Sequence, residues 1–218
     1  NEKRLEESKK AIEHCLKLNE NILIEIGTDE NLGAMYSFNS LKEIEDEVKY
    51  FNNFFKPEFF VVQTGSLVKE INQVGSFNEN FIKECSDLIR RNEIKLKEHN
   101  ADYLSSEEIK ERKNIVDALN IAPQLGVIQT GLVLNKCLIY GIQFNDFANI
   151  VYEGSKWKKW LHNNDKKNKY LCTQIAGHYH FASDEYKKIV EQLNVHEDIS
   201  ENIIETIMEV IDHYESSI

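Results

Sequence analysis

Residues 94–103 read IKLKEHNADY, and this stretch decides the fold that we expect for the chain. Its first half alternates apolar and polar residues, which is typical of a short β-strand. Its second half brings an acid, an imidazole and a second acid within five positions, as Glu98, His99 and Asp102. In parallel α/β folds the loops converge at the carboxyl ends of the strands, and the chemistry lies there. We therefore expect these three residues to be catalytic groups.

Three further stretches are predicted to form buried strands: 22–26 (ILIEI), 59–62 (FFVV) and 119–122. Helical patterns separate them, and strands that alternate with helices indicate a parallel sheet with right-handed crossovers. A doubly wound sheet and part of a (β/α)8 TIM-type barrel both fit. The barrel is favoured because the chain has neither a GxGxxG nor a GxxxxGK[ST] motif. We expect residues 1–145 to form about the last four βα units of a barrel, and 146–218 to form a helical tail packed on it.

Polar residues also follow the other predicted strands, where they would converge on one face of a barrel. Singly, each is more often structural, because a core Glu pairs with a cation and a Gln caps backbone groups. Gly65 and Ser66 are candidates for a phosphate-binding turn, because small residues let backbone N–H groups approach an anion. The complete predicted site comprises Glu98, His99, Asp102 and Asp29 as catalytic residues, and Glu25, Gln63, Gly65, Ser66 and Gln124 as substrate-binding residues.

The composition excludes several classes of function. The formal net charge is −11 and the sequence pI is near 5.2, which disfavours binding to nucleic acid or to an anionic membrane. No apolar run approaches the ~20 residues that a membrane span needs. The four cysteines are scattered, so we expect buried free thiols instead of a zinc finger or a disulfide framework. These features predict a cytoplasmic protein. His178 and His180, two positions apart, are weighed as metal ligands and as surface histidines, and the second interpretation is favoured.

Five stretches of the chain form one pattern: IEIGTDE (24–30), VVQTGSLVKEINQVGSF (61–77), KEHNADYLSSEEI (97–109), LNIAPQLG (119–126) and AGHYHFASDEYKKIV (176–190). In order and approximate spacing they resemble the C-terminal half of a known family, the tagatose-bisphosphate aldolase accessory subunits (GatZ/KbaZ-like proteins). Two positions depart from the family, which has Glu where this chain has Asp29 and Pro where it has Thr64. The matching positions are Asp29, Gln63, Gly65, Glu98, His99, Asp102, Tyr103 and Pro123.

The resemblance implies a TIM barrel related to class II, metal-dependent aldolases and a subunit that supports a separate catalytic partner in carbohydrate metabolism. It also implies a sugar phosphate as ligand and a divalent metal, Zn²⁺, with His99 as its ligand and with Glu98 or Asp102 either as the base or as a group that orients the metal ligand. One histidine is few for catalytic zinc, which usually has three protein ligands, so the accessory role is favoured.

Two alternatives remain: a metal-dependent aldolase or isomerase active in its own right, and a non-enzymatic α/β interaction module. Four strands alone would expose two sheet edges. We therefore expect a partner, either the catalytic subunit or a missing N-terminal half of the barrel.

Overall fold

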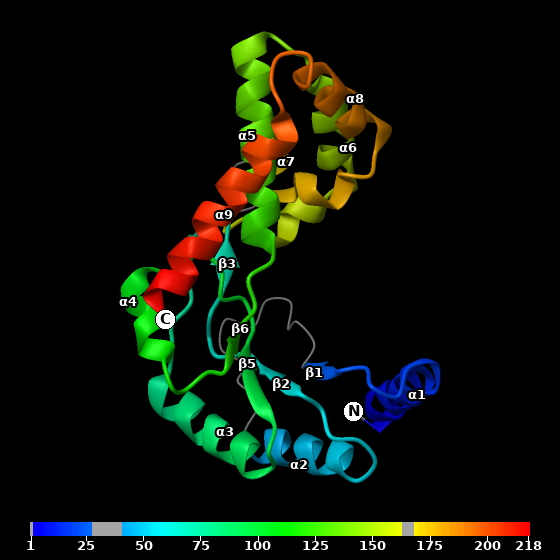
Figure 1. The fold of residues 1–218 in the computed structure, drawn as a ribbon, viewed down its shortest axis with the longest axis vertical. Helices are drawn as coiled ribbons and strands as arrows, with labels where there is room; N and C mark the ends of the chain where they lie inside the picture. Colours follow the sequence, from blue (N-terminus) through cyan, green and yellow to red (C-terminus); the bar gives the residue numbers. More distant parts are fainter. Residues whose placement is uncertain (1, 28–40, 163–167) are drawn as a thin grey trace. The chain divides into compact units, whose positions relative to one another are not determined.

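The computed structural model describes residues 2–27, 41–162 and 168–218 (Figure 1). Contacts within the chain divide it into two compact units, and each unit is described by itself. The sheet unit comprises Asn1–Gly65, Ser76–His99 and Arg112–Asn120, and the helical unit comprises Ser66–Gly75, Asn100–Glu111 and Ile121–Ile218. The boundary expected at residue 145 stays a prediction.

The sheet unit contains, in its described residues, a four-stranded sheet in the order β1-β2-β5-β6, and all of its pairs are parallel. Its strands are β1 (Glu25–Gly27), β2 (Phe59–Val62), β5 (Lys95–Glu98) and β6 (Ala118–Leu119). Its helices are α1 (Glu2–Leu18), α2 (Leu41–Asn52) and α3 (Glu79–Arg91). The expected parallel α/β order is confirmed. Within the described ranges the sheet is open, with β1 and β6 at its edges, so the closed barrel stays a prediction.

The core of the sheet unit forms where α2 and α3 cover one side of the sheet (Figure 1). Val48 and Phe51 on α2 and Ile82 on α3 are fully buried, because the apolar residues of each helix recur at the helical period. Phe60 on β2 and Leu96 on β5 meet them from the strands and are also fully buried. Burying each such side chain contributes about 1.5–3 kcal/mol, so this layer holds the short strands in place.

The helical unit is built around α5 (Pro123–Tyr140), whose apolar side chains are buried where it packs against α7, α8 and α9. A small hairpin of β3 and β4 also belongs to this unit, and the Arg112 end of α4 belongs to the sheet unit. The elements of the helical unit are β3 (Val68–Lys69), β4 (Asn72–Gln73), α4 (Ser106–Arg112), α5 (Pro123–Tyr140), α6 (Asn145–Gly154), η1 (Lys156–Lys159), α7 (Lys169–Ala176), η2 (Gly177–His180), α8 (Asp184–Leu193) and α9 (Ile199–Ser217).

Several elements differ from the expectation. The strand predicted at 22–26 is observed three residues later, as β1 (Glu25–Gly27). The strand predicted at 119–122 is shorter and ends at Leu119. Residues 123–126, expected at its carboxyl end, form the first turn of α5, because the fixed φ of Pro123 suits the start of a helix. The β3–β4 hairpin and the 3-10 helix at residues 177–180 are further elements, for which the sequence pattern gives no expectation.

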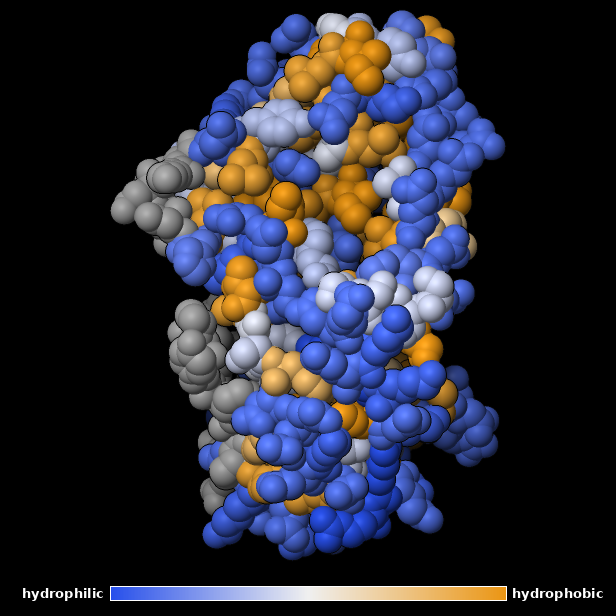
Figure 2. All heavy atoms as spheres, turned by 90° about the vertical axis from the view of Figure 1, so that its left-hand side faces the viewer, coloured by the Kyte–Doolittle hydropathy of each residue, from blue (hydrophilic) through white to orange (hydrophobic). Residues whose placement is uncertain are grey.

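The surface of the helical unit carries exposed apolar side chains, and Figure 2 shows apolar residues gathered on one of its faces. Leu138 and Ile139 near the end of α5 are 61% and 69% exposed, and Ile204 on α9 is 61% exposed. Among the described residues, no helix is both long and apolar enough to cross a membrane.

Candidate functional site

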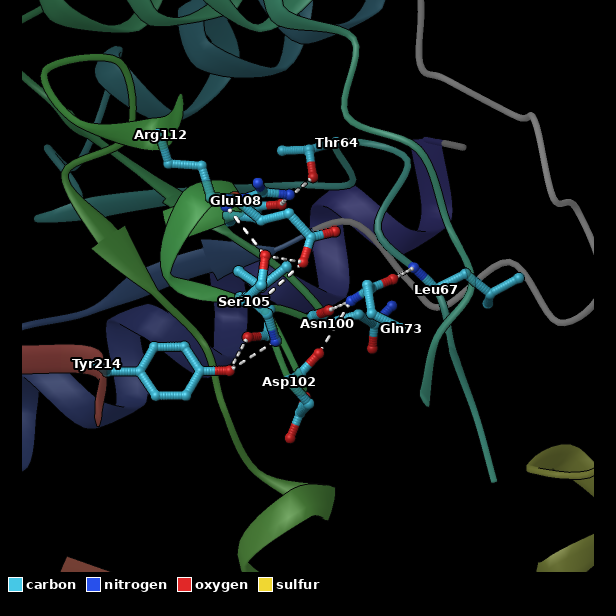
Figure 3. A network of polar contacts seen from close by, with 12 residues as sticks. Thr64, Leu67, Gln73, Asn100, Asp102, Ser105, Glu108, Arg112 and Tyr214 are labelled. Atoms are coloured by element: carbon cyan, nitrogen blue, oxygen red, sulfur yellow. Dashed lines mark hydrogen bonds and ion pairs between the residues drawn. The ribbon is translucent and has the colours of Figure 1, made fainter. Parts of the chain in front are cut away.

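Glu98 lies at the carboxyl end of β5, and its side chain is fully buried. Both of its carboxylate oxygens accept hydrogen bonds. Arg112 donates from Nε to Oε2 at 2.7 Å and from Nη2 to Oε1 at 3.1 Å, and the Thr64 hydroxyl donates to Oε1 at 2.6 Å. Figure 3 shows Thr64 and Arg112 in this network. Glu98, the predicted catalytic acid, therefore forms a buried bidentate ion pair with Arg112.

This ion pair joins three segments that are distant in the sequence. Thr64 follows β2, Glu98 ends β5 and Arg112 ends α4. The Arg112 guanidinium also lies over the ring of Phe77, 4.2 Å from its centroid. A carboxylate held by three hydrogen bonds in a dry interior is well suited to positioning. It is poorly suited to proton transfer, because taking a proton would leave the buried guanidinium without its counter-charge.

His99 follows Glu98 and is half-buried in the sheet unit. Its Nδ1 lies 3.3 Å from the side-chain nitrogen of Asn120. When the amide donates to Nδ1, the ring proton lies on Nε2, and that nitrogen becomes the donor. The His99 backbone N–H donates to Val62 O at 3.2 Å, which continues the sheet pairing by one residue. The imidazole is thus fixed at the end of β5, beside the Glu98 pair.

Asp102 is fully buried in the helical unit, where its carboxylate caps α5. Its Oδ1 accepts hydrogen bonds from the backbone N–H groups of Ala122 at 3.0 Å and Gln124 at 2.8 Å. Ala122, the residue before the helix, offers no side-chain cap of its own. The first N–H groups of a helix need acceptors, and a negative charge there is stabilised by the helix dipole. Asp102 therefore has a clear structural task.

The loop 100–104 is tied to the rest of the helical unit by long polar side chains (Figure 3). Gln73 donates from Nε2 to the carbonyl oxygens of Asn100 and Asp102, both at 3.0 Å. The hydroxyl of Tyr214 on α9 donates to Ala101 O at 2.7 Å. Asn100 and Tyr103 have left-handed φ values of 57° and 59°, so the loop needs these bonds to hold a costly backbone conformation.

Gln124 is a support for the same loop, because its Oε1 accepts from the Tyr103 N–H at 2.8 Å. Its predicted role in substrate binding stays a prediction. The sequence offered no signal for Arg112, Asn120, Gln73 and Tyr214, since each pairs with a residue distant in the chain.

The remaining predicted residues are dispersed. Glu25 starts β1, where it is exposed and paired with Lys97 at 2.7 Å. Gln63 is half-buried just after β2, and Gly65 has the left-handed φ of 101° expected of a turn glycine. Ser66 is buried and belongs to the helical unit. Asp29 lies outside the described residues. The structure therefore brings Glu98, His99 and the end of β2 together in the sheet unit.

The described residues contain no group of three or more His, Cys, Asp or Glu side chains that could hold a metal ion. Glu98 is engaged by Arg112 and Thr64, and Asp102 caps α5. These side chains do not fit a zinc centre as they stand, and the zinc site at His99 stays a prediction.

His178 and His180 lie on η2, and each ring fits against a glycine of another helix. A Cβ on Gly126 of α5 would lie 2.5 Å from the His178 Cβ, and a Cβ on Gly154 of α6 would lie 2.9 Å from His180 Nε2. Burial, together with smaller effects of the nearby Lys159 charge and the His180 ring, lowers the pKa of His178 to about 4. His178 is therefore a neutral packed side chain at neutral pH.

Comparison with known proteins gives structural matches without sequence matches. No family model matches the chain, and no curated protein matches it. A structure described as a probable tagatose 6 phosphate kinase from Sinorhizobium meliloti matches with a TM-score of 0.57 and 12% identity, covering 90% of this chain and 62% of that one. At this identity the likeness shows a shared fold alone.

Two further structures match more loosely. The YdjI aldolase from Escherichia coli has a TM-score of 0.44 and 13% identity, covering 92% of this chain and 58% of that one. The fructuronate-tagaturonate epimerase UxaE from Cohnella laeviribosi has a TM-score of 0.48 and 12% identity, covering 96% and 47%. The chain therefore spans less than two thirds of the length of each of these three proteins.

Replacing Arg112 by Met should destabilise the protein by about 3–5 kcal/mol, because the Glu98 carboxylate would stay buried without its counter-charge. The double variant Glu98→Gln/Arg112→Met should recover a large part of this loss, since no buried charge remains. Urea unfolding followed by circular dichroism measures both. Equal stability of the single and double variants would show that the charge pair is not what holds the site.

Asp102→Ala should lower the free energy of unfolding by about 1–2 kcal/mol through loss of the α5 cap. Asp102→Asn keeps an oxygen acceptor and should cost less. Asp212→Ala, at an exposed position on α9, serves as the matched control and should change little. If Asp102→Ala has the same free energy of unfolding as this control, the Asp102 side chain does not stabilise α5 as a cap.

The stability of the protein should fall as the pH falls from about 6.5 towards about 4, because His178 takes up a proton in the unfolded chain before it does so in the folded one. Solvent screening of the half-buried ring limits this loss to about 1–2 kcal/mol. Urea titrations at both ends of this range measure the slope. His178→Gln should flatten it, whereas exposed His162→Gln should leave it unchanged.

Proposed function

We propose that this chain is an accessory, non-catalytic subunit of a class II sugar-bisphosphate aldolase, of the GatZ/KbaZ-like type. The proposal rests on how the two acids of the stretch EHNAD (98–102) are bound within the fold. Glu98 is held by Arg112 and Thr64, and Asp102 caps α5. Both acids of the family-like stretch are thus engaged in holding the fold, which suits a subunit that leaves catalysis to a partner.

The fold likeness supports the carbohydrate side of the proposal. One similar structure is described as a probable tagatose 6 phosphate kinase, and the parallel strands with their helices suit a TIM-type barrel. The described sheet has open edges at β1 and β6, and unpaired edge strands are available for pairing with further strands. In our proposal the remaining strands come from an N-terminal half or from the partner subunit.

The exposed apolar side chains of the helical unit support a protein partner. Leu138, Ile139 and Ile204 each expose about three fifths or more of their surface. Apolar residues gathered on one face mark sites of protein association more often than a uniform polar surface does (Figure 2). We propose that the catalytic aldolase subunit contacts this face.

An active sugar-phosphate aldolase or isomerase is the second candidate, and His99 is the observation that favours it. The imidazole is held by Asn120 at the end of β5, and histidine is the side chain that most often serves as a general acid or base. In such an enzyme His99 would move a proton at a hydroxyl or carbonyl group of the substrate, while Glu98 and Arg112 would keep the strand end in place.

Co-expression with a class II aldolase catalytic subunit, followed by affinity purification and a ketose-bisphosphate cleavage assay, tests the proposal. We expect a stable complex whose cleavage rate exceeds that of the catalytic subunit alone, and no turnover by this chain alone. Ile139→Glu should weaken the complex, because it places a charge at an exposed apolar position of the helical unit, whereas Lys188→Glu at an exposed position on α8 should not. Cleavage by the isolated chain that is lost in His99→Ala would instead support the second candidate.

A further inference from the structure

Helix α9 is held at its two ends, whereas its middle is only partly covered. Ile199 at its start and Tyr214 near its end are buried, and the side chain of Asp198 caps its first turn. Between these anchors, no residue from 200 to 213 is buried. The helix therefore presents apolar side chains from a fixed position. The apolar residues of this stretch are Ile203, Ile204, Ile207, Met208, Val210 and Ile211.

Met208 lies at the centre of the exposed side of α9. It is 45% exposed, and Ile204, one turn before it, is 61% exposed. On a helix, the surface neighbours of a residue are those three and four positions away. For Met208 these neighbours are Ile204 and half-buried Ile211 on one side, and exposed Glu205 and Asp212 on the other. A row of apolar side chains thus runs beside a row of carboxylates.

The carboxylates of α9 are not neutralised by the chain itself. Its acidic side chains, all of them exposed, are Glu201, Glu205, Glu209, Asp212 and Glu215. The helix contains no lysine or arginine, and none of these acids forms an ion pair with another residue that the structure describes. Like charges one turn apart on a helix repel each other, and cations brought by a ligand would relieve this repulsion.

We propose that the α9 surface, defined by Ile204, Glu205, Met208, Ile211 and Asp212, binds an amphipathic helix of a partner protein whose apolar row is flanked by lysine or arginine. The partner's apolar side chains pack on positions 204, 208 and 211, the i, i+4 and i+7 spacing that helix recognition commonly uses. Its cations meet Glu205 and Asp212. Flanking charges of this kind set partner choice and orientation between paired helices.

The charge of α9 argues against other occupants of this surface. A second copy of the chain that placed α9 against α9 would set carboxylates opposite carboxylates. A helix that lies on a membrane has lysine and arginine on its polar face, whereas the polar face of α9 is acidic. A basic amphipathic helix complements both the apolar row and the acidic row.

The α9 surface would supply a contact that the proposed function requires of the helical unit. Only the identity of the partner as an aldolase subunit rests on that function. An aldolase complex that forms without binding of a basic helix to α9 refutes only the α9 surface. Binding of a basic helix without an aldolase complex refutes only the accessory role.

Fluorescence anisotropy of a labelled synthetic helix mixed with the full chain tests the inference. The probe is a peptide of about 20 residues, long enough to form a helix, with leucines in one row and lysines beside them. We expect this peptide to bind, and a version with glutamate in place of each lysine not to bind. The affinity should fall as the salt concentration rises, because exposed charges are screened. Absence of binding by the lysine peptide to the wild-type chain would overturn the inference.

Reversal of charge on α9 separates a specific contact from attraction to the net charge. Glu205→Lys/Asp212→Lys should weaken binding of the lysine peptide about tenfold or more and make the glutamate peptide the better ligand. The matched control, Glu13→Lys/Glu20→Lys, makes the same change at exposed positions of the sheet unit and should alter both affinities far less. An equal change in this control would show that only net charge matters, which overturns the inference.

The double variant Ile204→Ser/Met208→Ser tests the apolar row. It should weaken binding of the lysine peptide about tenfold or more, while thermal unfolding followed by circular dichroism changes little because both side chains are exposed. Leu18→Ser/Leu23→Ser removes two exposed leucines of the sheet unit and should leave the affinity unchanged. Sedimentation of the free chain tests the second copy as occupant: a dimer that Ile204→Ser/Met208→Ser dissociates would contradict the proposed partner.

Discussion

The buried ion pair between Glu98 and Arg112 is the interaction on which the geometry of the sheet unit depends. The strands that it stabilises are short, between two and four residues each. Few ladder hydrogen bonds therefore fix their ends. A fully buried carboxylate cannot remain charged without a partner, so the end of α4 must lie where Arg112 can reach β5. The Thr64 hydroxyl extends the same requirement to the end of β2.

A buried carboxylate is also stabilised in the helical unit. There the backbone N–H groups at the start of α5 bind Asp102, in the role that Arg112 has for Glu98. Helix α5 is long and apolar, and its first turn contains Pro123 and no side-chain cap from Ala122. Asp102 supplies the missing acceptor from a loop that precedes the helix by twenty positions. Residues that look catalytic in the sequence thus satisfy cations and backbone donors, and the same chemistry that suits an acid for proton transfer suits it for these tasks.

The parts of the fold that the sequence predicts are those with local causes. The run FFVV forms β2, and α3 begins after Asn78, whose side chain caps it, because these signals lie within a few residues. The pairing of Glu98 with Arg112 joins residues 14 positions apart, and that of Gln73 with Asn100 joins residues 27 apart. No local pattern encodes such a contact. Glu25 was placed at a strand end, but β1 starts at Glu25, so the side chain lies at the opposite end.

The charged side chains of the chain differ in burial. The two acids of the EHNAD stretch are fully buried and engaged with groups of the chain itself, whereas Lys156 and Lys158 are exposed on a turn fixed by tryptophans. A net charge of −11 repels anions at a distance, but screening in physiological salt limits that field to about 8 Å. An exposed charge therefore acts mainly on groups within this distance, whereas the buried pair of Glu98 and Arg112 is screened much less and holds its partners firmly.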